Sequence, residues 1–493
     1  MVIKYVSDDT APLYAAASGG TVRLELLWGD QVTVLEPTTP RSKVRARGKT
    51  GFVSASALGD QSLLEVYFID VGQGDGVLIR TPDGRHLMID GGYKRASQPT
   101  GKNAADFVDW KFARDYGLSQ IHLDVMMASH NDADHYGGLS DLLNVDQIDE
   151  LDATDVRVDA FYHAGVAWWI NPGNGSRWLG PTSPDKKFLT QLMGSRPQVV
   201  AALADDADPK LQGEWGQLMR NVTDARTVEG TATPIERLSH LDRYVPQFDG
   251  RGDGVAIRVL APFETMVAGQ PALHNYGSAA SKNTNGNSLL LRLDYKRVRI
   301  LLTGDLNADS QRALLRDYVG GRIEFQCDVA KACHHGSDDV SYEFLSAMRP
   351  AATVISSGDN EGHDHPRPAI VAASATTGYL EIAADRIVTP LVYSTELARS
   401  VNLGKPVKLT VAGPDVATVV DKTELRTATV EAKVTKAGDL NPTTVKRTLD
   451  RTYIVTGLIY GLVNVRTDGD RILCATLNEK DNTWQIKAFA SRF

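Results

Sequence analysis

The sequence is poor in cysteine, and Cys327, Cys333 and Cys474 form no Cys-x-x-Cys pair. An odd, unpaired set argues against a disulfide framework and favours a reducing compartment. Uninterrupted apolar runs of about 18 residues are also missing, so no membrane span is expected. The first residues, MVIKYVSDDTAPLYAAASGG, lack a basic stretch followed by an apolar one, and they predict no signal peptide. These absences together predict a cytoplasmic protein.

Basic residues are also fewer than acidic ones. The 53 Lys and Arg residues are outnumbered by 61 Asp and Glu residues, which gives a formal net charge of -8 and a pI of about 5.8. A protein coated with basic charge for non-specific nucleic-acid binding is thereby excluded, but a local basic groove is not. What is present is ordinary globular composition, 42% hydrophobic and 23% charged. A chain of 493 residues predicts about two to four domains.

Residues 1–62 predict a small all-β unit. Apolar and polar residues alternate there between Gly, Pro and Ser in TVRLELLWGDQVTVLEPTTPRSKVRARGKTGFVSASAL. The order of these elements resembles a bacterial SH3-like barrel, which implies a module for a protein partner or for self-association. The GKT sequence at 48–50 imitates a phosphate-binding loop, but Lys43 stands where that loop needs glycine. We predict a turn between two strands instead.

Residues 63–375 predict an α/β domain. Apolar strand-like runs such as LLEVYFIDV, LDVMMASH and RVRILLTGD alternate there with helical patterns, which is typical of strands that lie under helices. Between about 140 and 250 the pattern loosens, and we expect a partly helical insertion over one edge of the core. Residues 376–493 turn β-rich again and predict either a further unit or an extension of the sheet.

One stretch, ASHNDADHYGGL at 128–139, concentrates metal-ligand types. His130, Asp132 and Asp134 follow an apolar run at every second position, so in extended backbone their side chains point to one side. His135 comes next, and the Gly-Gly pair allows a helix to approach a strand closely. Converging imidazoles and carboxylates suit a divalent metal. The alternative is a solvated loop with a capping aspartate, but two His and two Asp after a buried strand favour the metal.

Further ligand types lie at the ends of other strand-like runs. They are Asp305 after RVRILLTG, His334 and His335 in DVAKACHHGS, His163 in VRVDAFYHAG, and His363 and His365 in ATVISSGDNEGHDHPRP. Ligands gathered at several strand ends are how α/β folds build a site. Two metals need about six to eight ligands and a shared carboxylate, and this inventory supplies them.

Six motifs in order resemble those of metallo-β-lactamase-fold hydrolases, and most of all the soluble hydrolase domain of ComEC-type DNA-uptake proteins. They are FIDVGQGDGVLIRTPDGRHLMIDGG, SHNDADHYGGL, NGNSLLLRL, ILLTGD, ACHHGS and HPRP. The resemblance covers roughly residues 63–375. It implies an α/β fold of the αββα sandwich type with a two-metal site at one edge. The whole chain would then comprise the SH3-like β-barrel, this hydrolase domain and the β-rich C-terminal region.

The resemblance implies a role for each matching residue. One metal is assigned to His130, Asp132 and His163, the other to Asp134, His135 and His335, with Asp305 between them. His163 follows a strand in the right order, although it is also consistent with a histidine that faces the insertion. Asp132 replaces a histidine of the zinc-lactamase pattern, so Mn²⁺ competes with Zn²⁺.

Other residues are expected to support the reaction. A water activated by the two metals would attack phosphorus or a carbonyl carbon, and His365 or His334 would protonate the leaving group. Asp90 is expected to hydrogen-bond the loop that carries the ligands. Asp75 in the IDVGQGD motif is expected to belong only to a tight turn.

Phosphodiester hydrolysis in nucleic acid is the first hypothesis for the substrate. Trp168, Trp169 and Trp178 would stack bases, unless they pack the insertion. His363 or His365 would contact the substrate phosphate. The basic stretch 93–115 would guide phosphates, unless it is a solvated helix face. The alternative substrate is a small ester, a lactone or a phosphocholine-type phosphodiester. A binding protein on a degenerate hydrolase scaffold is disfavoured because every expected ligand position is filled.

Overall fold

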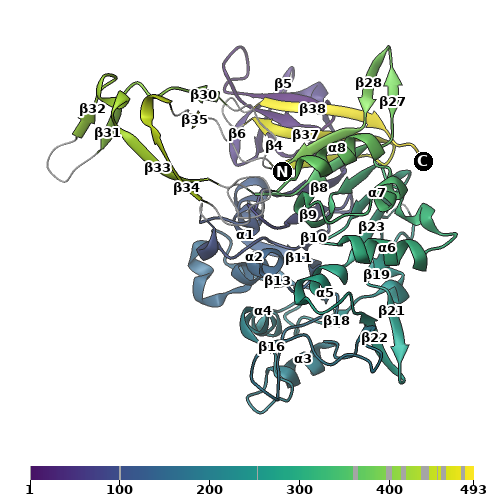
Figure 1. Cartoon of the computed structure of the whole chain (residues 1–493). Helices are drawn as coiled ribbons and strands as arrows, with labels where there is room; N and C mark the ends of the chain where they lie inside the picture. The colour runs from purple at the N-terminus through teal and green to yellow at the C-terminus, as the bar shows by residue number, and fades with distance from the viewer. Residues whose placement is uncertain are drawn as a thin grey trace.

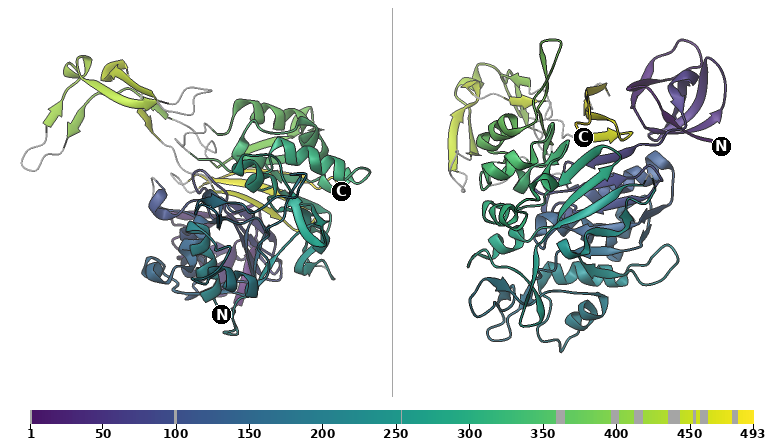
Figure 2. Two further views of the ribbon diagram at one scale, coloured as in Figure 1. Left: turned by 60° about the horizontal axis from the view of Figure 1, so that its bottom comes forward. Right: turned by 90° about the vertical axis from the view of Figure 1, so that its right-hand side faces the viewer.

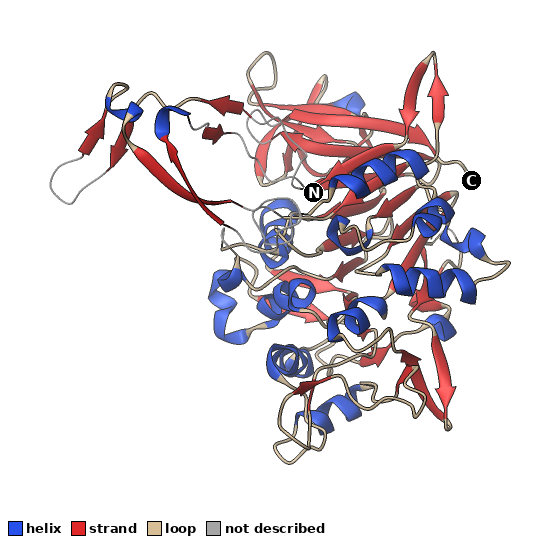
Figure 3. Ribbon diagram, viewed as in Figure 1, coloured by secondary structure: helices blue, strands red, loops and turns tan. Residues whose placement is uncertain are grey.

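The structure is a computed structural model, and two large sheets form its centre (Figures 1 and 3). It describes residues 2–98, 101–252, 254–358, 365–395, 402–411, 418–434, 443–451, 454–456, 462–478 and 483–493. Among these residues, none of the helices has both the length and the apolar character needed to span a bilayer.

The first central sheet has nine strands and runs from β18 at one edge to β38 at the other. In spatial order the strands are β18 (Ile235–Arg237), β14 (Phe161–His163), β12 (Val125–Ala128), β10 (His86–Ile89), β9 (Val77–Arg80), β8 (Leu64–Phe68), β36 (Val463–Thr467), β37 (Arg471–Asn478) and β38 (Thr483–Ala490). The second central sheet has seven strands: β19 (Tyr244–Asp249), β20 (Ala256–Ala261), β23 (Leu290–Tyr295), β24 (Val298–Leu302), β25 (Val329–Lys331), β26 (Ala352–Ile355) and β29 (Leu391–Ser394).

The two sheets share one apolar core. Along β8, Leu64, Val66 and Phe68 belong to a cluster that also contains Leu291 and Ile300 of the seven-stranded sheet. The residues between them in the strand face the other way, because successive side chains of a strand alternate between its two faces. Strands that are covered on both faces read as continuous apolar runs, which is the pattern seen in the sequence.

Helices cover the outer faces of both sheets. Those on the nine-stranded sheet are α1 (Ala104–Asp109), α2 (Ala133–Leu143), α3 (Arg196–Leu203) and α4 (Gly213–Asp224). Those on the seven-stranded sheet are α6 (Ala308–Asp317), α7 (Tyr342–Met348) and α8 (Pro368–Thr377). The layers therefore run helix, sheet, sheet, helix, and the predicted mixed α/β class is confirmed.

Residues 2–59 form a separate all-β sheet with its own apolar core. Its strands in chain order are β1 (Val2–Val6), β2 (Thr10–Tyr14), β3 (Val22–Leu27), β4 (Gln31–Glu36), β5 (Arg41–Ala46), β6 (Lys49–Ser54) and β7 (Leu58–Gly59). Arg47 and Gly48 form the two-residue turn between β5 and β6, both with positive φ. The GKT sequence therefore starts in a hairpin turn between two strands, as predicted, and its last two residues begin β6. The likeness to an SH3 barrel stays a prediction.

The end of the chain is an extension of the central sheets. β29 pairs with β26, and β36 pairs with β8 and carries β37 and β38 with it. Between β29 and β36 an arm reaches away from the body (Figures 1 and 2). Its strands pair two by two: β30 (Asn402–Gly404) with β35 (Ile454–Thr456), β31 (Leu409–Val411) with β32 (Thr418–Val420), and β33 (Thr429–Val434) with β34 (Thr443–Thr448).

The segment expected as an insertion is only partly one. Residues 140–250 hold α3 and α4, but they also supply β14 and β18 of the nine-stranded sheet. The remaining short strands are β11 (Gln120–Leu123), β13 (Asp155–Val158), β15 (Trp169–Ile170), β16 (Arg177–Trp178), β17 (Phe188–Leu189), β21 (Glu264–Val267), β22 (Gln270–His274), β27 (Glu381–Ala383) and β28 (Arg386–Thr389). β14 lies in the predicted strand-like run VRVDAFYHAG, but β18 is only three residues long and no strand was predicted there.

Parallel pairing brings the polar strand ends to one edge. β10, β12 and β14 run parallel, as do β24, β25 and β26 in the other sheet. The Leu289 N–H donates to the Ser129 carbonyl at 2.9 Å and joins the two sheets there. Loops that follow parallel strands meet outside the carboxyl ends of the sheet, where α/β proteins place their ligands.

Candidate metal centre

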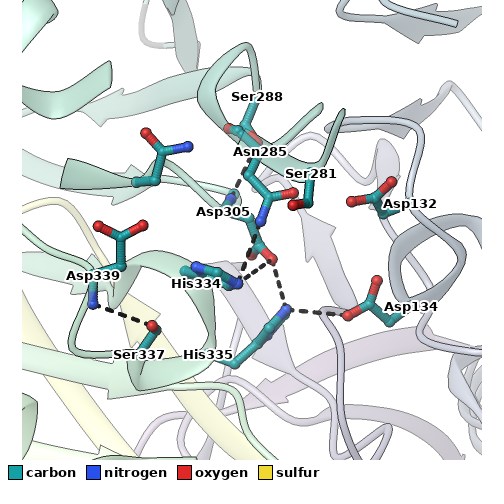
Figure 4. A network of polar contacts seen from close by, with 12 residues as sticks. Asp132, Asp134, Ser281, Asn285, Ser288, Asp305, His334, His335, Ser337 and Asp339 are labelled. Carbon is teal, nitrogen blue, oxygen red and sulfur yellow. Dashed lines mark hydrogen bonds and ion pairs between the residues drawn. The ribbon is translucent and has the colours of Figure 1, made fainter. Parts of the chain in front are cut away.

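Four buried side chains converge at this edge: Asp75, His135, Asp305 and His335. One ligand atom from each lies within 4.8 Å of the other three. Asp305 Oδ2 lies 3.2 Å from His135 Nε2 and 2.9 Å from His335 Nε2, and the two ring nitrogens are 3.2 Å apart. Figure 4 shows the contact between Asp305 and His335. One carboxylate oxygen therefore lies against two imidazole nitrogens.

The rest of the first motif adjoins this group. His130 Nε2 lies 3.7 Å from Asp132 Oδ2, and Asp134 Oδ2 lies 3.6 Å from His335 Nε2. The rings of His130 and His135 have centroids 4.0 Å apart. The structure thus brings together six of the predicted ligands: His130, Asp132, Asp134, His135, Asp305 and His335.

Local sequence explains how the first motif is presented. β12 ends at Ala128, and α2 begins at Ala133 with Asp132 as its N-cap residue in extended conformation. A Cβ on Gly138 would lie 2.1 Å from the Gly91 carbonyl oxygen, so only glycine lets α2 rest on the loop after β10. The predicted close approach of helix and strand is confirmed. It positions both the extended residues and the first turn of α2 over the centre.

The backbone at the second histidine motif is strained. His334, His335 and Gly336 have φ values of 47°, 51° and 81°. A non-glycine residue in this left-handed region costs about 1–3 kcal/mol and is typical of functional sites. The turn lets the His335 Nδ1–H donate to the Ser356 carbonyl at 3.1 Å while Nε2 faces Asp305. His334 lies at the rim, with Nε2 at 4.0 Å from Asp305 Oδ2.

Asp90 holds the loop that carries the ligands. Its Oδ1 accepts from the Ser129 N–H at 2.7 Å, and its Oδ2 accepts from His135 Nδ1 at 2.8 Å. Both nitrogen donors are buried, and the carboxylate leaves Nε2 of His135 facing Asp305. This is the contact that the sequence predicts for Asp90.

Replacing Asp90 with asparagine is expected to weaken metal binding about 10- to 100-fold. Asparagine keeps the shape of the side chain, but its NH₂ group faces either Ser129 or His135, so one hydrogen bond is lost. Competition with a chromogenic chelator measures the affinity. Asp141→Asn is the matched control, because Asp141 is also buried and accepts from Arg95 and Asn103 away from the centre. An equal loss in both variants would assign the effect to folding.

Asp75 and Lys331 belong to the centre, although the sequence did not single them out for it. The Asp75 carboxylate forms an ion pair with the Lys331 ammonium and lies 3.3 Å from His335 Nδ1. Lys331 Nζ also donates to the Gly304 carbonyl at 2.9 Å and lies 3.6 Å from Asp305 Oδ1. The expectation that Asp75 only shapes a turn is therefore wrong. The sequence did offer a signal for both residues. Asp75 in QGD and Lys331 in DVAK are charged residues beside apolar, strand-like runs.

The NTNGNS segment forms the opposite wall of the centre, and α5 (Ala280–Gly286) carries its first residues. Thr284 Oγ1 donates to Asp132 Oδ2 at 2.8 Å, and the Asn285 amide lies 3.3 Å from His334 Nε2. Ser288 Oγ accepts from the Asp305 N–H at 3.1 Å (Figure 4). These small polar side chains hold Asp132 and Asp305 in place. No role was predicted for any of these side chains, although Asn285 and Ser288 lie in the NGNSLLLRL motif.

The field of the carboxylates favours positive charge at the centre. Burial lowers the pKa of His135 and of His335, but Asp305 and its neighbouring carboxylates outweigh it, and both pKa values lie well above 6.5. Burial and then the charge of Asp134 raise the pKa of Asp132 to about 7. Burial and then the charge of His135 lower the pKa of His130 to about 3, so His130 is neutral at pH 7.

These residues fit a bound cation. The Nδ1–H groups of His135 and His335 are already used by Asp90 and Ser356, so their Nε2 lone pairs face each other across Asp305 Oδ2. Only a proton or a metal ion makes that arrangement favourable. Within the described part of the chain, buried His130 Nε2 and Asp305 Oδ1 also lack a hydrogen-bond partner. Imidazole and carboxylate are the donors that Zn²⁺ and Mn²⁺ take.

His163 is not brought to this centre. Its Nε2 donates to the Gly194 carbonyl at 3.1 Å, and its Nδ1 accepts from the Gly165 N–H at 3.0 Å. Burial lowers its pKa to about 3, which suits a neutral ring in the core. His163 ends a strand as predicted, but backbone groups use both of its ring nitrogens, one in its own loop at Gly165 and one in a distant loop at Gly194.

The predicted substrate residues lie in different places. Trp168 and Trp169 are only 6% and 3% exposed and pack in the core, so neither ring offers an open face to a base. His365 lies beside the centre, with its ring centroid 5.8 Å from that of His334 and 6.4 Å from that of His335. His363 lies outside the described residues.

The chain resembles two competence proteins in sequence. ComE operon protein 3 of Bacillus subtilis (strain 168) is 25% identical over 316 residues, which cover 62% of this chain and 30% of that protein. Competence protein ComA of Neisseria gonorrhoeae is 37% identical over 87 residues, which cover 17% of this chain and 12% of that protein. The chain therefore matches less than a third of the length of either relative.

No protein-family model matches the chain. A crystal structure of a metal-dependent hydrolase of the β-lactamase superfamily aligns with 67% of this chain and 95% of its own, at 11% identity and a TM-score of 0.30. A score this low adds no argument to the geometry described above. The resemblance to competence proteins that the motifs predict is confirmed by the two sequence relatives.

Proposed function

We propose that the chain is a metal-dependent hydrolase that cleaves phosphodiester bonds in nucleic acid with two divalent ions, Zn²⁺ or Mn²⁺. The contact of Asp305 Oδ2 with Nε2 of both His135 and His335 carries this proposal. A carboxylate between two imidazoles, with more carboxylates on either side, is the ligand set of a shared metal site.

The assignment of ligands follows the geometry. Asp134, His135 and His335 would hold one ion, and His130 and Asp132 the other, with Asp305 shared between them. His163 drops out of the predicted set. Bound there, divalent ions supply Lewis acidity and lower the pKa of a coordinated water.

Residues of the chain supply the rest of the chemistry. The Lys331 ammonium holds the carboxylates of Asp75 and Asp305 in place and offsets part of their charge. Burial lowers the pKa of His334, so its ring is neutral at pH 7 and its N–H can hydrogen-bond a leaving oxygen at the rim. His365 lies next to it and is the second candidate for that hydrogen bond.

Nucleic acid is the proposed substrate class because of the resemblance to ComEC-type proteins. The two relatives with competence names support it, although the chain covers only part of each. The channel of an uptake protein is not part of this proposal. Hydrolysis of a small ester or phosphodiester is the alternative outcome of the experiment below.

Cleavage of labelled single- and double-stranded DNA with Mn²⁺ or Zn²⁺ tests the proposal. We expect cleavage by the wild type, loss of cleavage in EDTA, recovery on adding metal, and at least a 100-fold loss in Asp134→Ala. That factor corresponds to about 3 kcal/mol of transition-state stabilisation. No cleavage of DNA by protein that binds two metals, together with turnover of p-nitrophenyl esters, would favour the small-ester alternative.

A further inference from the structure

A cavity of about 500 Å³ opens beside the metal centre. It lies between the residues around β16, the turn before β17 and the start of α5. Its polar and aromatic lining includes Trp168, Arg177, Trp178, Lys186, Asn275 and Asn283. A volume of this size is typical of a small-molecule site.

Two lining residues of the cavity, Trp168 and Asn283, adjoin the metal centre. Trp168 Nε1 donates at 2.7 Å to the carbonyl of Asn131, which lies between the motif residues His130 and Asp132. On the other wall, Asn283 precedes Thr284, whose hydroxyl donates to Asp132. Figure 4 shows side chains of the same helix, α5, beside Asp132. A ligand in the cavity therefore lies next to whatever reacts at the centre.

The cavity carries positive charge that the protein itself leaves unpaired. Arg177 lies with its guanidinium carbon 3.5 Å from the centroid of the Trp168 ring. Stacking on a ring leaves the in-plane N–H groups of arginine available for a phosphate. Among the residues that the structure describes, no carboxylate lies within ion-pair distance of Arg177 or Lys186.

The basic stretch at 93–115 behaves differently. Its cations face carboxylates of the same chain: Lys94 with Glu214, Arg95 with Asp106, Lys111 with Asp115 and Arg114 with Asp152. Those charges are neutralised in place, so they offer little to a phosphate. An acidic chain with a net charge of -8 that keeps two free cations at one cavity is expected to use them for an anion.

We propose that this cavity binds a nucleotide of a single-stranded nucleic acid next to the bond that the metal centre cleaves. Arg177 and Lys186 bind its phosphates, and the half-buried ring of Trp178 stacks on its base. The inference rests on the proposed function. The cavity admits an unpaired nucleotide and not a duplex, and stacking with backbone charge is how proteins hold single strands without reading their sequence.

The double variant Arg177→Gln, Lys186→Gln tests this inference. Both side chains are at the surface, so the fold is expected to persist. For a labelled single-stranded oligonucleotide we expect KM to rise at least 10-fold. The plot of log kcat/KM against log salt concentration should become less steep by about 1.4, which is about 0.7 for each lost phosphate contact. The kcat/KM for bis(p-nitrophenyl) phosphate, whose single phosphate sits at the metals, should stay unchanged.

Lys187→Gln is the matched control, because Lys187 is next in the chain but its side chain is 73% exposed and faces Asp185 at 3.6 Å. The inference is overturned if the double variant has the same KM for the oligonucleotide and the same salt dependence as the wild type. If that variant still cleaves bis(p-nitrophenyl) phosphate, the proposed function is unaffected.

If the wild type cleaves neither substrate, the proposed function fails, and direct binding decides the inference. Fluorescence anisotropy of the oligonucleotide, in EDTA and in an Asp305→Asn background, compares the affinity with and without the double substitution. A loss of at least 10-fold supports the cavity, and equal affinity overturns it.

Discussion

Replacing Asp305 with asparagine is expected to lower kcat/KM of the metal-dependent reaction by about 10²- to 10⁴-fold. Asp305 Oδ2 is the oxygen that both His135 Nε2 and His335 Nε2 face. Asparagine keeps the shape but removes the negative charge, which costs several kcal/mol of metal-derived stabilisation, and each 1.4 kcal/mol is about tenfold in rate. Steady-state kinetics with metal content measured on the same samples checks this result.

Asp309→Asn is the control for this substitution. Asp309 lies in α6 with its side chain 44% exposed and pairs with Lys282 and Arg312 at the surface. We expect wild-type activity and metal content from it. An Asp305→Asn protein that keeps full activity and its metals would move the chemistry away from this edge of the sheets.

Replacing Arg466 with methionine is expected to lower the free energy of unfolding by about 3–5 kcal/mol. Arg466 lies in β36 and is only 2% exposed. Its guanidinium donates to the Trp28 carbonyl at 2.6 Å, pairs with Asp30 at 2.8 Å and lies 3.9 Å from Glu65. Removing it leaves the Asp30 carboxylate buried without a cation, at the contact between the N-terminal sheet and the core. Urea unfolding at pH 7 measures the loss.

Two further variants test whether the loss of stability comes from the buried ion pair between Arg466 and Asp30. Arg471→Met removes a cation that also joins the C-terminal strands to the N-terminal sheet, through Asp9, but at the surface. It should cost about 1 kcal/mol or less. Adding Asp30→Asn to Arg466→Met should recover part of the stability, because the uncompensated charge is then removed. No recovery would assign the loss to packing of the arginine stem.

The effect of Arg466→Met should depend on pH. Burial raises the pKa of Asp30 and of Glu65, but the charge of Arg466 outweighs it, and both pKa values lie below their ordinary values of 3.8 and 4.5. A carboxyl group with a lowered pKa in the folded state stabilises the fold above its ordinary pKa and loses that contribution as the pH falls. The difference in the free energy of unfolding between the wild type and Arg466→Met should therefore be largest near neutral pH and should become smaller below about pH 4.

Local pattern was enough to predict much of the centre. His130, Asp132 and Asp134 follow one strand at alternate positions, and the glycine pair after them can only mark a close packing contact. Asp305 and His335 each end an apolar run, so a parallel sheet must deliver them to the same edge. Alternation along extended backbone holds only as far as Asp132, because α2 begins at Ala133 and presents Asp134 from its first turn.

Prediction failed where a contact depends on two distant segments. Asp75 and Lys331 meet only because β8 and β25 lie in sheets that face each other, and no local pattern encodes that register. His163 ends a strand like the true members of the cluster, yet the backbone at Gly194, in a loop 31 residues further on, takes its ring nitrogen. For Trp168 and Trp169 the sequence left open whether they stack bases or pack the insertion, and only the fold shows both in the core.

The sequence alone therefore determined the α/β class, the strand-end motifs and six of the converging side chains, because each follows from spacing along one segment. The tertiary structure alone decided that Asp75 and Lys331 complete the centre and that His163 does not. It also decided that, within the described ranges, Arg177 and Lys186 have no carboxylate partner while the cations of 93–115 do. Those outcomes depend on which side chains meet across the fold, and distance along the chain carries no information about that.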